Sequence, residues 1–292
     1  MTGPKDEMKI AITGASGFIG TKLTLRFRAE GYGVVPVSLR GAMDAQALAA
    51  KLEGCGAVIH LAGEPVAQRW SDAAKQRIRD SRVLGTRLLV DAIAQMDTKL
   101  QVLISTSAIG YYGSRGDEVL TEESSPGSDF LAQVVRDWEA EARRAESFGV
   151  RVVMPRVGLV LGTEGGVLQK LLLPFRLGLG GRIGSGKQWS SWIHIDDLIL
   201  LFEYAIAEPR MHGPVNAVAP NPVTNAEFTE ILAKALHRPA LFPVPAFALK
   251  LGAGEMAEML LGGQKVLPQA AEAVGFRFRY LRLADALAQL LE

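Results

Sequence analysis

A glycine-rich segment, Gly14-Ala-Ser-Gly17-Phe-Ile-Gly20, has the spacing of a phosphate-binding turn. It follows a short apolar run at 9–13 and precedes a stretch of helical character at 18–30. Glycines permit a tight turn and let backbone N–H groups approach a pyrophosphate, while the helix N-terminus adds partial positive charge. The strand–turn–helix context favours a dinucleotide site over an ordinary glycine-rich turn. The residues expected to contact the cofactor here are Gly14, Ser16, Gly17, Phe18, Ile19 and Gly20.

The end of the next β-rich run, 33–39, indicates which nicotinamide cofactor would bind. An NAD site usually carries Asp or Glu about 20 residues after the glycines, where the carboxylate bonds the ribose 2′-hydroxyl. No acidic residue lies between Tyr32 and Met43, and Ser38 and Arg40 stand at the end of the run. A carboxylate would repel a 2′-phosphate, whereas a guanidinium can hold one through charge-assisted hydrogen bonds. The sequence therefore predicts NADP(H); the competing interpretation of Arg40 is a solvated loop cation.

Strand-like and helix-like segments alternate over the first half of the chain, which is typical of βαβ units and a parallel sheet. After residue 156 the pattern changes to Gly- and Leu-rich stretches, prolines and helices. These patterns predict an α/β fold, with a doubly wound parallel sheet (a Rossmann fold) and a smaller, mainly helical C-terminal lobe. We expect a dinucleotide-binding domain at 8–165, completed by 188–220, and a substrate-side lobe at 166–187 and 221–292. Expected strands cover 9–13, 33–39, 57–61, 102–105, 150–154 and 214–218, and expected helices cover 18–30, 44–53, 71–96, 129–148 and 283–291. The stretch 193–207 is expected to be the entry of a strand followed by a helix.

Composition limits the classes of partner. The chain has 292 residues, with 32 Lys and Arg against 31 Asp and Glu, so its bulk charge gives no support for a nucleic-acid or acidic-membrane partner. The single cysteine, Cys55, excludes an internal disulfide and a cysteine-based zinc site, and His194-Ile-Asp196-Asp197 offers too few ligands for a metal. No apolar run is long enough for a membrane span, and residues 1–7 lack the apolar core of a secretory signal. We expect a cytoplasmic protein that binds a small-molecule substrate and has no metal, nucleic-acid or membrane partner. The sequence also allows a homodimer.

Five segments together resemble the extended short-chain dehydrogenase/reductase superfamily: GASGFIG at 14–20, HLAG at 60–63, RVLGT at 82–86, STSAIGYYG at 105–113 and WIHIDD at 192–197. The later segments APNPVTNAEF at 219–228 and VLPQAAEAVGFRFRY at 266–280 resemble an atypical branch. Members of that branch are called epimerase family proteins and carry a C-terminal domain of unknown function. The resemblance covers nearly the whole chain from Met8. It implies a nicotinamide cofactor, with Leu61, Ala62, Gly63 and, after the expected strand at 150–154, Pro155 among its neighbours.

The sequence departs from this superfamily at the residues that carry its chemistry. The usual set is a Ser, a Tyr and a Lys, the last two spaced YxxxK, with an upstream Asn. Ser107 aligns with the Ser, but the YxxxK position reads Leu131-Ala-Gln-Val-Val135, and Arg82 stands at the Asn position. In the family, Lys binds the nicotinamide ribose and lowers the Tyr pKa. Without Lys, a nearby Tyr keeps a pKa of about 10, so phenolate is scarce at pH 7, whereas a neutral phenol can still protonate a reduced carbonyl.

The remaining candidates each have a structural alternative. Ser107 would orient a substrate carbonyl, or it caps a turn. Tyr111 or Tyr112 would donate the proton, or both rings pack against the lobe. Arg82 would bind an anionic substrate or replace the missing lysine, or it forms a salt bridge with Asp80 or another acid on the helical surface.

The resulting hypothesis is an NADP(H)-dependent oxidoreductase or epimerase-like enzyme acting on a small carbonyl or hydroxyl compound. The missing Tyr/Lys pair motivates the alternative of a non-catalytic NADP(H)-binding sensor or scaffold. An NADP-assisted isomerase or dehydratase is a third possibility.

Overall fold

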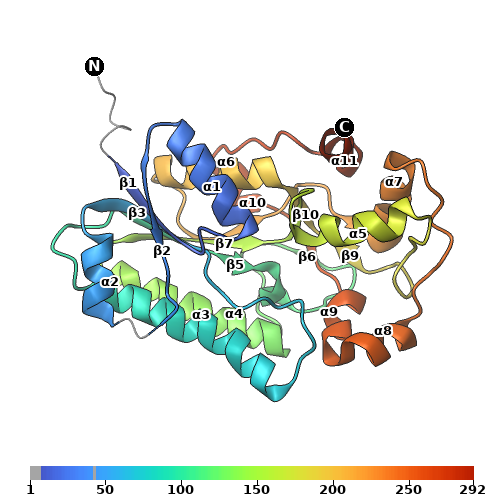
Figure 1. Cartoon of the computed structure of the whole chain (residues 1–292), viewed down its shortest axis with the longest axis horizontal. Helices are drawn as coiled ribbons and strands as arrows, with labels where there is room; N and C mark the ends of the chain where they lie inside the picture. Colours follow the sequence, from blue (N-terminus) through green and yellow to red (C-terminus); the bar gives the residue numbers. More distant parts are fainter. Residues whose placement is uncertain (1–7, 42–43) are drawn as a thin grey trace.

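The apolar runs of the first half of the chain become the strands of one parallel sheet. The computed structural model describes residues 8–41 and 44–292, and Figure 1 shows the sheet between helices. All of the ladders in this sheet are parallel. In spatial order its strands are β2 (Gly33–Val37), β1 (Lys9–Thr13), β3 (Cys55–His60), β4 (Val102–Ser105), β7 (Arg151–Val157) and β11 (Gly213–Ala217), with β5 (Ser107–Ala108) paired to β7.

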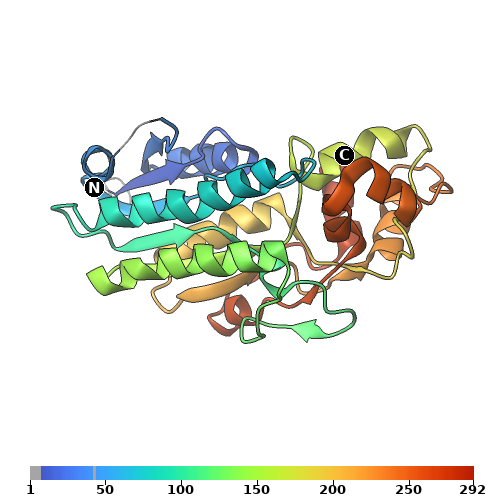
Figure 2. The ribbon, with the colours of Figure 1, turned by 90° about the horizontal axis from the view of Figure 1, so that it is seen from below.

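Helices cover both faces of the sheet, because successive side chains of a strand point to opposite faces. Ile10 and Ile12 pack in a core with α1 (Phe18–Ala29), α6 (Ile195–Ala207) and α10 (Gln269–Ala273). Ala11 and Val58 pack in a second core with α2 (Ala45–Leu52), α3 (Asp72–Ile93) and α4 (Phe130–Arg143). Figure 2 shows α3 and α4 side by side across that second face. The predicted doubly wound parallel sheet is therefore confirmed.

Strand order reverses at β1. This strand pairs with β2 on one side and with β3 on the other, so the chain crosses from one edge of β1 to the opposite edge between these two strands. In open α/β sheets, ligands bind at such a point, outside the carboxyl ends of the strands. The turns after β1 and β3 both lie at this edge and begin at Gly14 and Leu61.

Two prolines lie inside strands, and each is tolerated for a definable reason. Pro36 belongs to β2, an edge strand that pairs only with β1 along the described sheet, so its missing N–H need not interrupt a second ladder. Pro155 lies inside β7, and not after it as the sequence suggested. Its position falls between the β4 pairing, which ends at Val153, and the β5 pairing, which begins at Arg156.

The C-terminal lobe has its own apolar core. Leu168 and Phe175 of α5 (Gly166–Arg176) pack with Leu232 of α7 (Asn225–Ala235) and Leu287 of α11 (Leu283–Leu291). The lobe and sheet are tied together by buried Asp197, whose carboxylate accepts the backbone N–H groups of residues 279 and 280 at 2.9 and 3.0 Å. The remaining elements are β6 (Val119–Leu120), β8 (Leu159–Leu161), β9 (Trp189–Ser190), β10 (Trp192–His194), β12 (Val223–Thr224), α8 (Ala246–Ala253), α9 (Ala257–Leu261), β13 (Lys265–Val266) and short 3₁₀ turns at Ile109–Tyr112, Arg144–Phe148 and Gly254–Met256.

One segment of the predicted lobe packs with the sheet instead. Ala271 of α10, together with Phe276 and Phe278, joins the core that contains β1 and α6. The division predicted from the sequence, which placed all of 221–292 in the lobe, therefore differs from the packing at 269–278. Within the described residues, no helix is both long enough and apolar enough to cross a membrane.

Candidate functional site

The turn between β1 and α1 leaves the helix N-terminus without a side-chain cap. Gly17 is the N-cap residue, and the first turn of α1 contains no acidic side chain. Gly14 has φ +70°, and a Cβ there would lie 3.0 Å from the Ala62 nitrogen. A Cβ at Gly20 would overlap the Gly14 carbonyl oxygen. Glycine at 14 thus lets this turn pack tightly against the turn after β3, and glycine at 20 lets the start of α1 pack against the turn itself. The free N–H groups of α1 are suited to bind an anion.

The predicted cofactor contacts lie along this edge. Ser16 and Gly17 are exposed on the turn, with Phe18 and Ile19 half-buried behind them. Leu61, Ala62 and Gly63 form the neighbouring turn after β3, and Ser38 and Arg40 follow β2. The exception is Pro155, which is buried inside β7.

Arg40 lies where a 2′-phosphate would be expected. Its backbone N–H donates to Ser38 Oγ at 3.2 Å, which shapes the turn after β2. Its side chain is exposed and makes no ion pair with another described residue. The guanidinium is therefore available to a ligand at this edge.

A buried histidine links the turns after β1 and β3 to helix α3. His60 Nδ1 lies 2.6 Å from Thr13 Oγ1, and His60 Nε2 lies 3.0 Å from Thr86 Oγ1. Thr13 Oγ1 also accepts the N–H groups of Leu61 and Ala62. Burial, with a smaller effect of the Arg82 charge, lowers the pKa of His60 to about 4, so the imidazole is neutral at pH 7. The network fixes the ends of β1 and β3 without adding charge.

Arg82 of α3 reaches under the turn after β3. Its Nη1 donates to the carbonyl oxygens of Glu64 at 2.9 Å and Ile78 at 3.2 Å, and its guanidinium lies 5.4 Å from the Trp138 ring centre. Burial lowers the pKa of Arg82 to about 10, which still leaves it charged at pH 7. The alternative of a surface salt bridge is wrong, because Arg82 forms no ion pair with a described residue and the Asp80 carboxylate accepts from Gln76. The structure thus places a largely buried cation beside the predicted cofactor edge.

Ser107 is buried and its hydroxyl is already used. Ser107 Oγ donates to Glu139 Oε1 at 2.6 Å, and the side chain of Arg156 forms two further hydrogen bonds to the same carboxylate, each of 2.8 Å. The exposed fractions of the Arg156 and Glu139 side chains are 1% and 4%. Burial alone would lower the pKa of Arg156, but the hydrogen bonds and charge of Glu139 raise it above its ordinary value. The expectation that Ser107 donates to a substrate carbonyl is therefore corrected, since its one proton is committed to Glu139.

The two tyrosines differ in what their hydroxyls can do. Tyr112 is fully buried, donates to Asn216 Oδ1 at 2.6 Å and accepts from Arg156 Nη1 at 2.9 Å. Burial raises its pKa to about 12. The Tyr111 ring stacks on Arg156, with its centre 3.5 Å from the guanidinium carbon, and no hydrogen bond of the Tyr111 hydroxyl is found among the described residues. The proposed proton-donor role of Tyr112 is thus contradicted by its contacts, whereas that of Tyr111 stays a prediction.

The helix that would carry YxxxK presents apolar side chains and one carboxylate. Val135 is buried on α4, and Leu131 lies beside Gly110 of the loop after β5. Glu139 follows at four-residue spacing, which places it on the same face of the helix. This face therefore supplies no phenol or ammonium group.

Some polar groups near the sheet edge lack partners. Ser105 Oγ, at the end of β4, and the neighbouring Thr106 Oγ1 are buried without a hydrogen bond, as is Trp138 Nε1 on α4. Ser105 pairs in register with His60 of β3. Uncapped α1 amides, glycines with no room for a Cβ and unpaired hydroxyls at the same edge fit a polar, anionic dinucleotide.

Sequence reasoning missed the importance of Arg156 and Glu139. The signal was present, because an arginine inside the apolar run Val152-Val-Met-Pro-Arg-Val157 can be buried only with a partner. Its partner lies 17 residues earlier on a helix, and no short motif connects the two.

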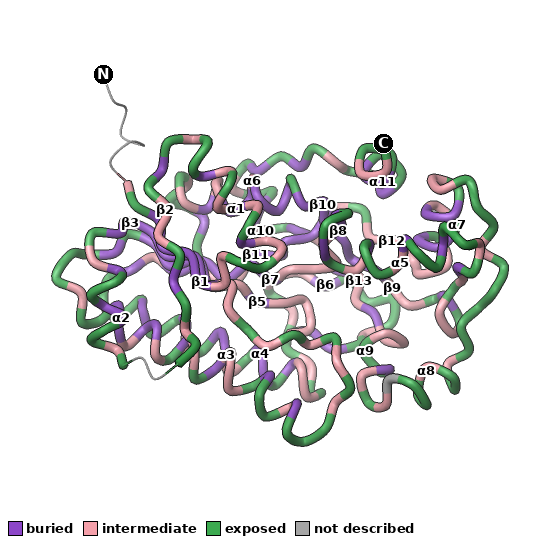
Figure 3. Tube along the Cα trace, in the orientation of Figure 1, coloured by how far each residue is buried: buried purple, intermediate pink, exposed green. Residues whose placement is uncertain are grey.

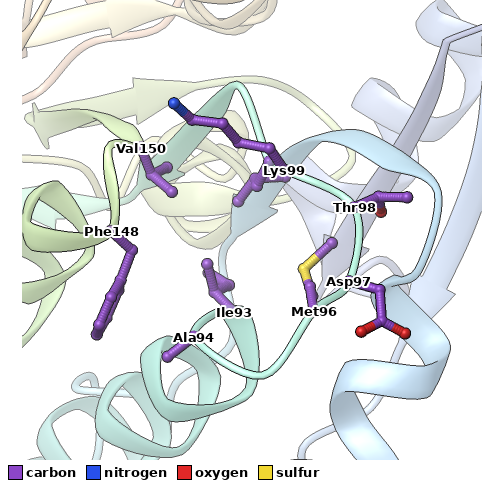
Figure 4. A pocket seen from close by; sticks show the side chains of 9 residues that line it. Ile93, Ala94, Met96, Asp97, Thr98, Lys99, Phe148 and Val150 are labelled. Carbon is purple, nitrogen blue, oxygen red and sulfur yellow. The ribbon is translucent and has the colours of Figure 1, made fainter.

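Hollows elsewhere on the molecule do not coincide with this edge. Figure 4 shows one of about 200 Å³ lined by Met96, Lys99 and Phe148 among others. It lies where the chain enters β4 and β7, which is the amino edge of the sheet. A larger groove of about 630 Å³ separates α7 from α11. Neither is lined by the residues of the predicted cofactor site.

Comparison with known proteins identifies two regions. Residues 10–218 match the NAD dependent epimerase/dehydratase family, and residues 244–290 match a domain of unknown function, DUF1731. The chain is 39% identical over 306 residues to the Arabidopsis thaliana protein called epimerase family protein SDR39U1 homolog, chloroplastic; the match covers 99% of this chain and 88% of that protein.

Solved structures of epimerase-family proteins are also similar to this chain. The crystal structure of human epimerase family protein SDR39U1 (isoform 2) with NADPH is 37% identical, with a TM-score of 0.90, and the match covers 97% of this chain and 99% of that one. A nucleoside-diphosphate sugar epimerase from Corynebacterium glutamicum is 38% identical, with a TM-score of 0.80, over 97% of this chain and 58% of that one.

The buried ion pair generates a stability prediction. Replacing Glu139 by Gln leaves Arg156 buried without a counter-charge, and we expect the free energy of unfolding to fall by about 3 kcal/mol. The matched control is Glu141→Gln on the same helix, where the exposed partners Arg87 and Arg144 remain solvated and the loss is at most about 1 kcal/mol. Urea unfolding monitored by circular dichroism measures both; equal losses would contradict the assigned role of the pair.

The buried histidine generates a pH prediction. The folded-state pKa of His60, about 4, lies below the ordinary 6.5, so the unfolded chain binds this proton more readily. The stabilisation is complete above pH 6.5 and is lost as the pH falls towards 4, by about 3 kcal/mol. His60→Gln should remove this part of the pH dependence of urea unfolding, whereas His212→Gln, at an exposed position, should keep it. An unchanged slope in His60→Gln would refute the buried neutral state.

Proposed function

We propose that this chain, which belongs to the NAD dependent epimerase/dehydratase family, is an NADP(H)-dependent oxidoreductase or epimerase-like enzyme acting on a small carbonyl or hydroxyl compound. The observation that carries the proposal is the uncapped N-terminus of α1 at the point where strand order reverses, with Arg40 rather than an acidic residue after β2. The NADPH in the human relative supports the choice of cofactor. The cytoplasmic location and the homodimer stay predictions.

The residues of the chain divide the binding of NADP(H) among them. The N–H groups at the start of α1 would hold the pyrophosphate, with Gly14 and Gly20 allowing its approach. Arg40 and Ser38 would hold the 2′-phosphate. Arg82 and the unpaired hydroxyls of residues 105 and 106 would serve the nicotinamide half, where the family lysine is absent.

The chemistry would use NADP(H) as the source or acceptor of hydride, and the protein would move the proton. Tyr111 is the proposed donor, because its hydroxyl is free and Arg156 stacks against its ring. Ser107 offers only oxygen lone pairs, since Glu139 holds its proton, so it is suited to accept from a substrate hydroxyl. Arg82 would stabilise negative charge that develops on the reacting oxygen.

A second candidate function has its own observation. Leu131 and Val135 occupy the YxxxK positions, and the hydroxyls of Ser107 and Tyr112 are both engaged in buried hydrogen bonds. These features favour a non-catalytic NADP(H)-binding sensor or scaffold. Tight NADPH binding without turnover, together with a partner interaction that changes with NADPH, would support this candidate.

Cofactor selectivity is the first test. Isothermal titration calorimetry should give a Kd for NADPH at least about tenfold below that for NADH, because the 2′-phosphate gains a charge-assisted contact. Arg40→Glu should abolish or reverse this preference. Arg28→Glu, at an exposed position at the other end of α1, should leave it unchanged. A flat NADPH trace, or equal affinities in the natural protein, would refute the proposal.

The proton donor is the second test. In a screen of carbonyl compounds followed by NADPH absorbance, Tyr111→Phe should lower kcat by about 100-fold or more, as loss of a general acid does. Tyr112→Phe should keep most of the turnover but lower the free energy of unfolding by about 1–3 kcal/mol, because Asn216 Oδ1 and Arg156 Nη1 lose the buried hydroxyl to which they are hydrogen-bonded. Full activity in Tyr111→Phe would exclude this donor.

A further inference from the structure

Two segments of the lobe, residues 165–187 and 231–254, carry only positive charge. The first holds Lys170, Arg176, Arg182 and Lys187, and it contains no Asp or Glu. The second holds Lys234, Arg238 and Lys250, again with no Asp or Glu. These are seven of the 32 basic residues and none of the 31 acidic ones, which leaves 25 basic against 31 acidic in the rest of the chain. The near-zero net charge of the protein therefore conceals a strongly positive region.

The seven charged groups are accessible to a binding partner. All seven side chains are exposed, and none forms an ion pair with another described residue. The polar contacts that they do make are to carbonyl oxygens, such as Arg238 Nε to Arg176 O at 3.0 Å. No carboxylate from within the two segments balances this charge, although Glu164, Glu230 and Glu255 stand directly at their ends.

Exposed apolar side chains concentrate in the same two segments. They contain eight of the fourteen large apolar residues that are exposed within the described part of the chain. The most exposed are Leu251 at 77%, Leu241 at 73%, Phe247 at 69% and Leu173 at 66%. Such a concentration on a folded protein is typical of an interaction surface rather than of scattered surface residues.

The two segments form one continuous region, which we call the cationic end (165–187 and 231–254). Phe242 N donates to the Gly180 carbonyl oxygen, and Val244 N donates to that of Arg182, so the chains run side by side. A bridge between Ile183 and Val244 continues this pairing. Figure 1 places α5, α7 and α8 together at the end of the molecule opposite α2, and Figure 3 shows long exposed stretches there.

The charge of the cationic end distinguishes between two candidate partners, a second copy of this chain and an anionic bilayer. A second copy of this chain that met this region through the same face would place seven cations against seven, with no carboxylate from within either segment between them, which opposes self-association. Exposed leucines and phenylalanines among lysines and arginines are instead the composition of protein segments that lie on anionic bilayers. We propose that the cationic end docks on a membrane surface that contains anionic lipid. This proposal differs from the expectation of no membrane partner, which was based on the net charge of the whole chain.

In this arrangement the protein lies on the bilayer and does not span it. Phe242, Leu241 and Phe247 would enter the headgroup region, while the lysines and arginines contact lipid phosphates with their aliphatic stems along the interface. The first residues of the cationic end lie beside the glycine turn, since a Cβ at Gly165 would meet the side chain of Phe18. The lysines, arginines and exposed apolar residues named above are not among the predicted cofactor contacts, so binding of vesicles and binding of NADPH can be measured separately.

The test is vesicle co-sedimentation of the full-length chain. We expect binding to phosphatidylcholine vesicles with about 30% phosphatidylserine, at least about tenfold weaker binding to pure phosphatidylcholine, and release at about 0.5 M NaCl. The double variants Leu241→Ser/Phe242→Ser and Arg176→Gln/Lys250→Gln should each bind about tenfold less tightly. All of these side chains are exposed, and unchanged circular dichroism and NADPH calorimetry would show that the variants are folded.

The matched control uses apolar residues that are exposed elsewhere. Leu25→Ser/Phe148→Ser changes side chains of 60% and 44% exposure outside the cationic end and should keep full binding to phosphatidylserine vesicles. No binding to those vesicles, equal binding to pure phosphatidylcholine, or an equal loss in the control would overturn the proposal. Binding to polyglutamate without binding to vesicles would also overturn it and would indicate an acidic protein partner.

Discussion

The structure depends on a close approach between two turns, one after β1 and one after β3. Gly14 leaves no room for a side chain against Ala62, and Gly20 leaves none against the Gly14 carbonyl. This packing brings the start of α1 to the carboxyl edge of the sheet with its amides unused. A helix terminus with unpaired donors and no acidic side chain is a favourable place for a phosphate, which is why the glycines, the strand reversal and the ligand belong to one explanation.

Beside this anion site, the chain lacks the Tyr/Lys pair of the superfamily and has a buried, hydrogen-bonded cluster of polar side chains. Glu139 and Arg156 neutralise each other, and they orient Ser107 and Tyr112 through hydrogen bonds. A buried ion pair is weak evidence for net stability, but removing one partner is costly, so the cluster is rigid once formed. The hydrogen bond changes what Ser107 can offer a ligand. Because its hydroxyl donates to the Glu139 carboxylate, Ser107 can act toward a ligand as an acceptor but not as a donor.

Much of the fold followed from local patterns. The strands at 9–13 and 102–105 and the helix at 283–291 were predicted with the bounds that the structure has, because apolar runs and caps act over a few residues. Arg82 and Ser107 were found by motif, but their partners were not, since Glu139 and the Glu64 carbonyl reach them only through tertiary packing. The return of Phe276 to the sheet core was missed for the same reason. The net charge of +1 likewise concealed the cationic end, because a sum over the chain discards position.

The glycine turn and the cationic end are two surfaces suited to bind anions. The first is formed by backbone amides and the second by side chains. The first depends on backbone geometry, whereas the second depends on charge and on exposed apolar side chains. The most direct measurement of the first is a nuclear magnetic resonance titration of the amide-labelled protein with NADPH. The amides of Phe18 and Ile19 should show the largest shifts, saturating together with the signal of the Arg40 side chain. Saturable binding that leaves these signals unmoved would contradict a site at the start of α1.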